Sequence, residues 1–419
     1  MKIISTSDWH IGNLFHGNDR LPEHKHFLAW LLEQLKEQQP DALLIAGDVF
    51  DNGNPSAAAQ SAYYEFLADA THACPEMQIV ITAGNHDSAT RLEAPRPLLS
   101  RYKVEIRGSV KRKWEDGKWI SNLDDLLIPV RNAAGEEIIV IAVPYLRSDV
   151  INSGCYSLGV TEFLRNVTAR AREMYPESRL VMMAHMYAKG ADIALNDASE
   201  KIIIGGLEEV NMEGWEEHPD YLTCGHIHKR QHIWNTDWAR YTGSILPMSF
   251  AEVSYKHGVD MITFGPDGNR NVEFLQYTPQ HKLRILPENG EEMDEKQVKK
   301  LIKAKLRDRG ADGKLSDSFD YVVIKVKMEK ISNDTISELE KAFDSKDAVL
   351  CKIQKIIPAI NISTIRGDQA LKSIDDILNR DPLETLREAF AIKHNTEMNQ
   401  HQHDMLKEVI ENIRNEHKD

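Results

Sequence analysis

Metal-binding side chains follow a series of short apolar runs in the N-terminal part of the chain. The runs are "KIISTS", "DALLIAG", "QIVITAG", "RLVMMAH" and "DYLTCGH", and the side chains at or just beyond their ends are Asp8, His10, Asp48, Asn85, His185, His226 and His228. Carboxylate, amide and imidazole donors without thiolate suit manganese, iron or zinc at a labile catalytic site better than a closed structural zinc site. These residue types therefore favour a metal-dependent catalytic centre.

The elements that must position these side chains can also be predicted. Each apolar run is short, rich in β-branched residues and ends abruptly in Gly or a polar residue, which is typical of a buried strand. Amphipathic helices are expected between the strands, at 22–40, 56–71 and 161–174. This alternation predicts a layered α/β domain. Because the carboxyl ends of strands in such a sheet meet at one crevice, the candidate ligands are expected to come together there.

The order of the motifs matters more than any one of them. A single Asp or His after a strand is more often a turn former or a helix cap than a metal ligand. Here D-x-H, G-D-x-x-D, G-N-H-D, a strand-terminal His and G-H-x-H follow one another, each after an apolar run. Their joint occurrence favours a single metal site over a set of unrelated turns.

The segments "SDWH", "AGDVFD", "AGNHDS", "AHM" and "CGHIH" resemble the pattern of the calcineurin-like metallophosphoesterases, most specifically over residues 1–277. The resemblance implies a four-layer α/β/β/α sandwich with two divalent metal ions, expected to be Mn2+, with Mg2+ or another divalent metal as alternatives. It also implies that Asp48 bridges the ions. One ion would be completed by Asp8, His10 and His228, and the other by Asn85, His185 and His226.

Three adjacent residues in "AGNHDS" are expected to have different roles. If Asn85 points at the metals, His86 projects differently and can reach the scissile phosphate or the leaving oxygen as a proton donor. The resemblance implies that the carboxylate of Asp51 orients His86, and an adjacent carboxylate favours the charged imidazolium. Asp87 is expected to shape the loop by accepting hydrogen bonds from nearby backbone amides.

Composition changes near His281, and three regions are predicted. Residues 1–280 would form the nuclease domain, 281–360 a small α+β capping domain, and 361–419 a helical segment with an apolar stripe on its last helix. The resemblance implies a DNA exonuclease and endonuclease that processes double-strand ends and hairpins. It further implies an SMC-like ATPase partner bound by 361–419, a homodimer of this chain, and a heterotetramer with the ATPase.

Charge and composition limit the function classes. The formal net charge of −14 counts against binding nucleic acid by bulk attraction alone, although bound divalent cations can invert the sign of a local site. No apolar stretch approaches the roughly 18 residues of a membrane span, so a cytoplasmic protein is expected. The four cysteines form no C-x-x-C pair and are interpreted as small buried hydrophobic residues.

Two rival functions and two local interpretations stay open. The same metal ligands would serve a phosphoesterase acting on small phosphodiesters or phosphoproteins, and a scaffold could recruit DNA or an ATPase without cutting. Arg20 could contact a phosphate or lie solvated in its loop. The basic stretch 111–113, with Trp114 and Trp119, could be a nucleic-acid surface or an ordinary exposed hairpin. Six other histidines are interpreted as structural or surface residues: His16, His24, His26, His72, His218 and His232.

Overall fold

The computed structural model describes residues 1–148, 150–151, 155–192, 209–211, 214–265, 269–327 and 333–356. Contacts group residues 1–356 into one compact unit. The predicted C-terminal segment 361–419, with its apolar stripe, lies outside the described residues. The predicted boundary between residues 280 and 281 stays a prediction.

A six-stranded sheet carries the first three motifs. Its strand order is β16-β15-β1-β4-β5-β6, and the bounds are β1 Lys2–Thr6, β4 Ala42–Ala46, β5 Gln78–Thr82, β6 Val104–Arg107, β15 His257–Phe264 and β16 Arg270–Tyr277. Strands β1, β4, β5 and β6 are parallel, whereas β15 and β16 run antiparallel to their neighbours. The carboxyl ends of β1, β4 and β5 therefore lie along one edge of the sheet.

A second six-stranded sheet carries the remaining motifs. Its order is β13-β14-β12-β11-β10-β9, with bounds β9 Leu127–Arg131, β10 Glu137–Ala142, β11 Arg179–His185, β12 Tyr221–Gly225, β13 Gln231–His232 and β14 Ala239–Tyr241. Strands β10, β11, β12 and β14 are parallel. In this sheet, too, the ends of the central strands deliver metal-binding residues to one side.

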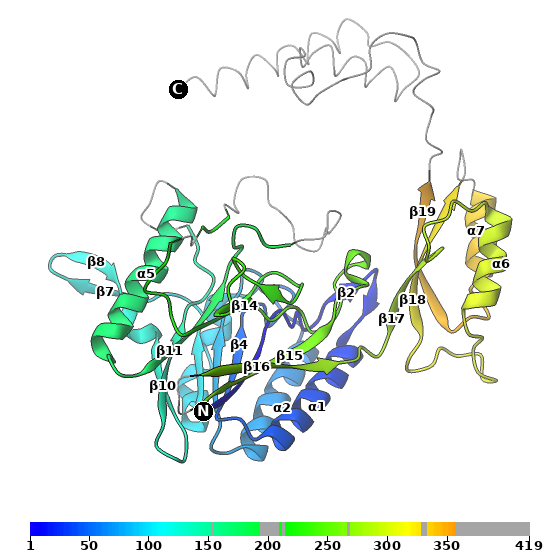
Figure 1. The fold of residues 1–419 in the computed structure, drawn as a ribbon. Coiled ribbons are helices and arrows are strands. Elements are labelled where there is room, and N and C mark those ends of the chain that lie inside the picture. Colours follow the sequence, from blue (N-terminus) through cyan, green and yellow to red (C-terminus); the bar gives the residue numbers. More distant parts are fainter. Residues whose placement is uncertain are drawn as a thin grey trace, which may run out of the picture. The chain divides into compact units, whose positions relative to one another are not determined.

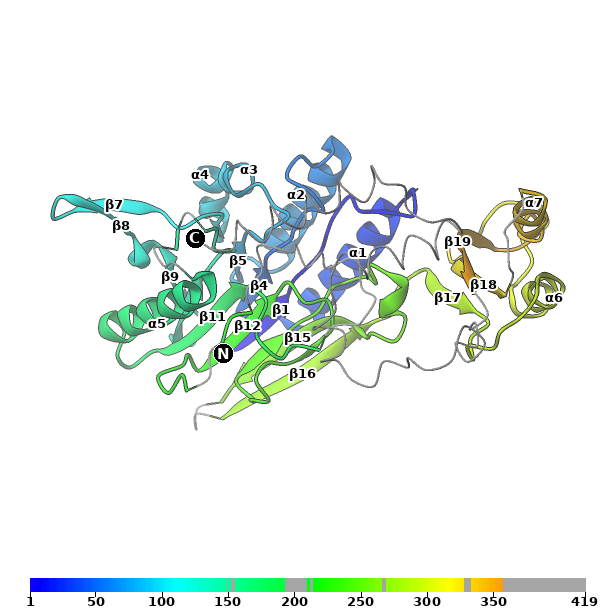
Figure 2. The same ribbon diagram turned by 90° about the horizontal axis from the view of Figure 1, so that it is seen from above.

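Helices cover the outer faces of the paired sheets (Figures 1 and 2). An apolar layer that includes Leu44, Val80, Val140 and Met183 fills the space between the sheets. A second core joins the first sheet to α1 (Leu21–Gln38) and α2 (Ala57–Ala73), and a third joins the second sheet to α5 (Tyr156–Met174). The predicted four-layer α/β/β/α sandwich is confirmed.

Local sequence signals set the ends of these helices. Pro22 lies in the first turn of α1, where a missing N–H is tolerated, and the helix closes on Gln39 in the left-handed conformation, next to Pro40. Ser56 caps α2, because its hydroxyl accepts a hydrogen bond of 3.1 Å from the Ala59 amide.

Four short helical elements lie between β5 and β9: α3 Ala89–Glu93, α4 Arg96–Leu99, η1 Ser100–Tyr102 and η2 Leu123–Leu126.

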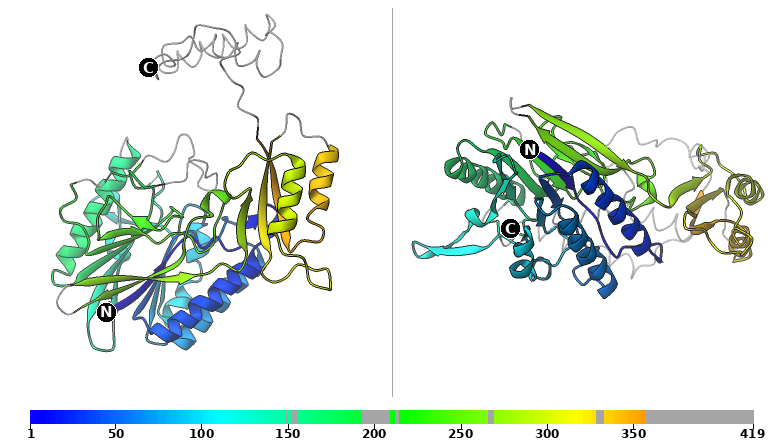
Figure 3. Two further views of the ribbon diagram at one scale, coloured as in Figure 1. Left: turned by 45° about the vertical axis from the view of Figure 1, so that its right-hand side comes forward. Right: turned by 90° about the horizontal axis from the view of Figure 1, so that it is seen from below.

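Residues 282–356 form a small α+β unit with its own core. The parallel sheet β17-β18-β19 (Lys282–Leu286, Asp320–Lys327, Ala348–Ile356) has α6 (Glu295–Lys305) and α7 (Asn333–Lys341) on one face (Figure 3). Asp294 and Gln297 form a capping box at the start of α6. The predicted succession of strand, helix, strand, helix and strand is confirmed.

A two-stranded hairpin of β7 (Arg112–Glu115) and β8 (Lys118–Ser121) projects from the body of the molecule (Figures 1 and 2). Asp116 and Gly117 both have positive φ, of 49° and 78°, which is the requirement of a two-residue turn that matches the strand twist. The indoles of Trp114 and Trp119 are paired across the strands, are 60% and 62% exposed, and have ring centroids 5.5 Å apart. The stretch is therefore a hairpin, and its interpretation as a nucleic-acid surface stays a prediction.

Within the described residues, no helix is long and apolar enough to cross a membrane. Cys74 and Cys224 are buried in apolar clusters, as expected, whereas Cys155 and Cys351 are only partly buried.

Among the histidines interpreted as structural or surface residues, His24 is fully buried on α1. Its Nδ1 lies 2.8 Å from the Arg20 carbonyl. Burial, together with the charge of Arg20, lowers the pKa of His24 to about 4. The folded protein therefore holds this imidazole neutral at pH values where the unfolded chain protonates it.

This difference predicts a pH-dependent stability. Between pH 6.5 and about 4 the unfolded chain binds a proton at His24 that the folded chain does not, so the free energy of unfolding should fall as the pH is lowered. Urea denaturation at several pH values should show a shallower decline for His24→Gln than for the wild type. His72→Gln, on the exposed surface of α2, is the matched control and should keep the wild-type slope. Equal slopes for His24→Gln and wild type would contradict this account.

Candidate metal centre

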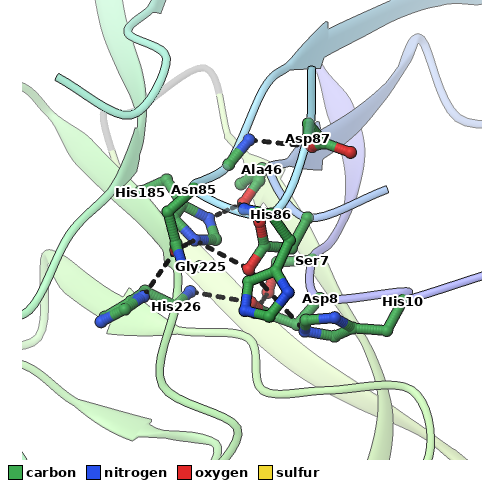
Figure 4. A network of polar contacts seen from close by, with 12 residues as sticks. Ser7, Asp8, His10, Ala46, Asn85, His86, Asp87, His185, Gly225 and His226 are labelled. Atoms are coloured by element: carbon green, nitrogen blue, oxygen red, sulfur yellow. Dashed lines mark hydrogen bonds and ion pairs between the residues drawn. The ribbon is translucent and has the colours of Figure 1, made fainter. Parts of the chain in front are cut away.

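The predicted ligands meet at the carboxyl ends of the central strands of both sheets (Figure 4). Asp8 and His10 follow β1, Asp48 follows β4, and Asn85 follows β5. From the second sheet, His185 is the last residue of β11, and His226 and His228 follow β12. Three overlapping sets of ligand atoms lie within 4.8 Å of one another: Asp8, His10 and His228; His10, Asp48 and His86; and Asp8, Asp48 and His185.

The backbone at several of these positions is strained. Asp8, His10, Asp48 and His226 have φ values of 52°, 45°, 49° and 95°, in the left-handed region that residues with a Cβ rarely adopt. Hydrogen bonds hold the first three in place: the Asp8 amide donates to the Gly47 carbonyl at 3.1 Å, and the His10 amide to the Asp48 carbonyl at 3.0 Å. Such strain gathers where the side-chain position matters.

Asp48 is the central carboxylate of the cluster. Its Oδ1 accepts a hydrogen bond of 2.8 Å from the His86 amide. Its Oδ2 lies 3.2 Å from His185 Nε2 and 3.7 Å from His10 Nε2. One oxygen is thus fixed by the backbone while the other faces imidazoles from both sheets, an arrangement in which the carboxylate can contact more than one cation.

Asn85 places its side-chain carbonyl between two imidazoles. Its Oδ1 lies 3.0 Å from His185 Nε2 and 3.0 Å from His226 Nδ1. His185 Nδ1 in turn lies 3.0 Å from the Ala46 carbonyl, so this nitrogen carries the proton that it donates to that carbonyl. The orientation leaves His185 Nε2 pointing at Asn85 and Asp48.

Asp8, His10 and His228 form the other side of the cluster. The Asp8 Oδ1 accepts a hydrogen bond of 2.9 Å from the His226 amide, and the Ser7 hydroxyl donates to its Oδ2. His228 Nδ1 lies 3.0 Å from the Oε1 of Glu252, a fully buried carboxylate in η3 (Phe250–Glu252). Sequence reasoning missed Glu252, although it lies just beyond the stretch "YTGSILPMSF", which ends two residues earlier.

The donor set fits divalent metal ions on its own chemistry. Both ring nitrogens of His10 are buried without a hydrogen-bond partner among the described residues. Asp8 and Asp48 are buried carboxylates whose negative charges repel one another. Unpaired imidazole nitrogens beside buried carboxylates are costly unless a cation joins them. The residues present therefore fit divalent metal ions, which take oxygen and nitrogen ligands of these types.

Electrostatics at the cluster follow from burial and from the pairing of opposite charges. Burial raises the pKa of the Asp8 carboxyl, against the attraction of His185 and His228. Burial alone would also raise the pKa of Asp48, but the charges of His185 and His10 outweigh it and hold that pKa well below its usual range. Conversely, burial disfavours charged His185, yet Asp48 raises the pKa of His185 to about 9.

His10 and His226 favour their neutral forms. Burial lowers the pKa of His10, and burial together with the charge of His185 lowers the pKa of His226 to about 3. Neutral imidazole is the form that binds metals. Among these candidate ligands, His185 would have to give up its proton before an ion could bind its Nε2.

His86 differs from the buried ligands because its side chain is exposed. Its Nδ1 lies 2.8 Å from the backbone carbonyl of Asp51. The Asp51 carboxylate instead accepts a hydrogen bond of 2.8 Å from Asn13 and lies 3.6 Å from His10 Nδ1. The predicted contact between the Asp51 carboxylate and His86 is therefore wrong. Asp51 contacts His86 through its backbone carbonyl, because the loop after β4 directs the Asp51 carboxylate toward His10.

Asp87 shapes the loop as predicted. Its Oδ2 accepts hydrogen bonds from the amides of Val49 at 3.1 Å and Gly84 at 2.9 Å, and its Oδ1 accepts one of 2.9 Å from Phe50. Burial and the charge of Asp48 raise the pKa of Asp87 to about 6. This carboxylate ties the loop after β5 to the loop after β4.

Neither of the two open interpretations of Arg20 is correct. The side chain is fully buried, with Nη2 2.6 Å from the Glu23 carboxylate and Nη1 donating to the Pro247 carbonyl at 2.5 Å. Its guanidinium also lies 5.0 Å from the centroid of the Phe15 ring. Arg20 thus joins α1 to the segment before η3.

Two glycines let the strand ends approach one another closely. A Cβ at Gly84 would lie 2.1 Å from Asp48 Oδ1, and a Cβ at Gly225 would lie 2.1 Å from the Ala46 carbonyl and 2.8 Å from His185 Nδ1. These distances are far inside van der Waals contact. The ligands can only sit where they do because these positions have no side chain.

Gly84→Ala should therefore displace Asp48. Overpacking of this kind costs about 1–3 kcal/mol. We expect a comparable loss in the free energy of unfolding and a loss of Mn2+ binding in isothermal titration calorimetry. Gly53→Ala is the matched control, because a Cβ there meets no atom closer than 3.6 Å. Full Mn2+ binding by Gly84→Ala would show that Asp48 does not need this close approach.

Comparisons with known proteins agree with this geometry. The calcineurin-like phosphoesterase family model matches residues 1–230. The chain is 37% identical over 295 residues to the D subunit of the SbcCD nuclease from Rhodobacter capsulatus, covering 68% of this chain and 71% of the relative. It is 29% identical over 297 residues to the corresponding SbcCD nuclease chain of Escherichia coli K12, covering 68% and 70%.

A solved structure, TT1561 of Thermus thermophilus, is 14% identical, covers 65% of this chain and 98% of its own, and has a TM-score of 0.36. With a score this low, the family assignment rests on the sequence relatives and on the paired sheets described above. The converging strand ends, the buried carboxylates and these relatives lead to one conclusion: the chain belongs to the calcineurin-like phosphoesterase family, among the SbcD-type nuclease subunits.

Proposed function

We propose that this protein is a metal-dependent DNA nuclease that hydrolyses phosphodiester bonds as an exonuclease and endonuclease. The observation that carries the proposal is the cluster in which Asp48 faces imidazoles from both sheets. The relatives that it resembles are named as nuclease subunits, which supports a nucleic acid as the substrate. Double-strand ends and hairpins, processed in DNA repair, recombination and replication, are the substrates that we assign to it.

Two Mn2+ ions are the proposed cofactors, with Mg2+ as the alternative. Asp48 would bridge them, and the remaining ligands divide into two sets. One set is Asp8, His10 and His228, and the other is Asn85, His185 and His226. When bound, such ions polarise the phosphate and lower the pKa of a coordinated water.

The chain's own residues supply positioning and proton transfer. The bond from His86 Nδ1 to the Asp51 carbonyl fixes the ring and leaves Nε2 available at an exposed position, where a phosphodiester can approach. His86 would stabilise the developing charge and donate a proton to the leaving oxygen. Asp51 also holds Asn13, so the His86 and His10 loops are fixed relative to one another.

The proposed partner is an SbcC-type SMC-like ATPase, bound by residues 361–419, for which the sequence predicts helices. The chain would act in the cytoplasm as a homodimer and as a heterotetramer with the ATPase. Its net charge of −14 supports a partner that contributes to DNA binding, because an acidic chain attracts DNA poorly at long range. We assign residues 1–280 to the nuclease domain and 281–360 to the capping domain.

An apolar groove supports the homodimer. Side chains of α2 and of the segment 98–104 line a groove of about 910 Å3 that includes Leu67, Leu98 and Val104. Within it, Tyr64, Leu98 and Tyr102 are 37%, 62% and 60% exposed. Clustered exposed apolar side chains of this size commonly mark protein interfaces.

The proposal predicts Mn2+-dependent cleavage of linear duplex and hairpin DNA that is abolished by chelator. His86→Ala should keep Mn2+ binding and lose turnover by about 10²–10⁴-fold, as expected for a lost proton donor. Asp48→Ala should lose both ions, measured by titration calorimetry.

Cleavage of a phenyl phosphodiester but not DNA would favour the small-phosphodiester alternative, and metal binding without any cleavage would favour a scaffold. A metal site emptied by His86→Ala would overturn the assigned role of His86.

The homodimer proposal predicts that Leu98→Asp weakens self-association. The charge would have to be desolvated in the interface, so the mass measured by light scattering should fall toward that of one chain. Leu14→Asp is the matched control, because Leu14 is 64% exposed in β2 (Leu14–Phe15), outside the groove. Equal masses for Leu98→Asp and wild type would contradict the assigned surface.

A further inference from the structure

Glu252 is a buried carboxylate that touches a metal ligand without belonging to the ligand set. Its side chain is fully buried, Oε1 lies 3.0 Å from His228 Nδ1, and Oε2 accepts a hydrogen bond of 2.8 Å from the Met248 amide. Both oxygens of the carboxylate therefore have assigned partners. A histidine that donates from Nδ1 to a carboxylate has a fixed tautomer, with the Nε2 lone pair available to a metal.

The short helix η3 that carries Glu252 is held from several sides. The Ser249 hydroxyl accepts a hydrogen bond of 3.2 Å from the Ala251 amide and begins the turn. Just before it, the Pro247 carbonyl accepts a hydrogen bond from the buried guanidinium of Arg20. These contacts fix the backbone on either side of Met248, whose amide holds Glu252.

The same helix also contacts the small α+β unit. The Phe250 ring lies 5.4 Å from the Phe15 ring, and Phe15 lies 5.1 Å from Tyr321 of β18. Phe15, Leu283 of β17 and Tyr321 form a buried apolar cluster with Phe250 packed against it. Two residues of one short turn therefore face different structures: Phe250 the small sheet, and Glu252 the metal ligand His228.

We propose that Glu252 is a positioning residue that fixes the His228 ring for metal binding, and that η3 makes this orientation dependent on the small β17-β18-β19 sheet. A shift of Phe250 moves Glu252, because only one residue separates them in a turn that is held by the hydrogen bond from the Ala251 amide to Ser249. The affinity of the Asp8, His10 and His228 set then depends on the position of the small sheet. This inference rests on the metal centre proposed above.

Titration calorimetry of the full chain with Mn2+ tests the first step. A carboxylate that orients a metal-binding histidine typically contributes about 10–100-fold to metal affinity. Glu252→Ala should weaken one of the two Mn2+ sites by that factor and leave the other close to wild type. Glu252→Gln should give an intermediate loss of Mn2+ affinity. The Gln side-chain oxygen can still accept from His228, but its NH2 group then faces the Met248 N–H, and two donors cannot bond to one another.

Asp125→Asn is the matched control. Asp125 is a carboxylate in η2 that pairs with Arg96 and Arg107 and lies outside the ligand set. Its variant should bind both ions like the wild type. The thermal midpoint of the metal-free protein is measured alongside, because a merely structural role would lower that midpoint without singling out one Mn2+ site.

Phe250→Ala tests the coupling to the small sheet. It removes the contact with Phe15 without replacing Glu252 or any proposed ligand. We expect the Mn2+ site weakened by Glu252→Ala to be weakened several-fold here too.

The outcomes are distinct. Unchanged affinity at both sites in Glu252→Ala and Glu252→Gln, or an equal loss in Asp125→Asn, overturns the positioning role. A loss in Glu252→Ala with none in Phe250→Ala overturns the coupling. Absence of Mn2+ binding by the wild type would instead overturn the metal centre itself.

Discussion

Two buried carboxylates that face the same small volume impose the central constraint on this molecule. Asp8 and Asp48 come from neighbouring strands of one sheet, and each disfavours the ionised form of the other. Like charges held in a medium of low dielectric need a compensating cation. In the metal-free chain part of that role falls to His185, whose pKa Asp48 raises to about 9. With a metal ion held by these residues, the ion would provide the compensation and His185 would be neutral, so the candidate ligands and their electrostatics reflect one requirement.

The rest of the fold provides the rigidity that this requirement demands. Four ligand-bearing positions have left-handed backbone, and each such position costs of the order of 1–3 kcal/mol. The cost is offset by the apolar layer between the sheets and by the two outer cores, which fix the strand ends from which the loops depart. Asp87 and the close approach at Gly84 then join the loops to one another. Metal binding to the folded chain would add to this stability, because the unfolded chain has no assembled site.

Sequence patterns predicted the strands, a layered α/β domain and the residues that meet at the strand ends, because these follow from local periodicity and from the geometry of parallel sheets, whereas the four layers were implied by the family resemblance. Atom-level choices did not follow. The acceptor of the His86 bond is the Asp51 carbonyl rather than its carboxylate, which depends on the exact path of one loop. Glu252 was missed and the burial of Arg20 was not predicted, for a related reason. Each is a charged residue that is buried together with a polar partner, Glu23 for Arg20 and His228 for Glu252. Glu252 and His228 are distant in sequence, and they meet only because the segments before β15 and after β12 lie side by side in the fold.

The contrast between exposed His86 and the buried ligands also bears on how an acidic protein could act on DNA. A chain with a net charge of −14 repels a polyanion at distances where its charges are felt as a sum. Close to the site, the buried carboxylates would be compensated by divalent ions, and the exposed imidazole of His86 would meet the phosphodiester first. Because the chain as a whole repels DNA and only the site itself attracts it, another surface would have to bring the DNA to the site. An ATPase partner that holds the DNA would supply it, and the nuclease subunit would then need affinity only for the phosphodiester that reaches its metals.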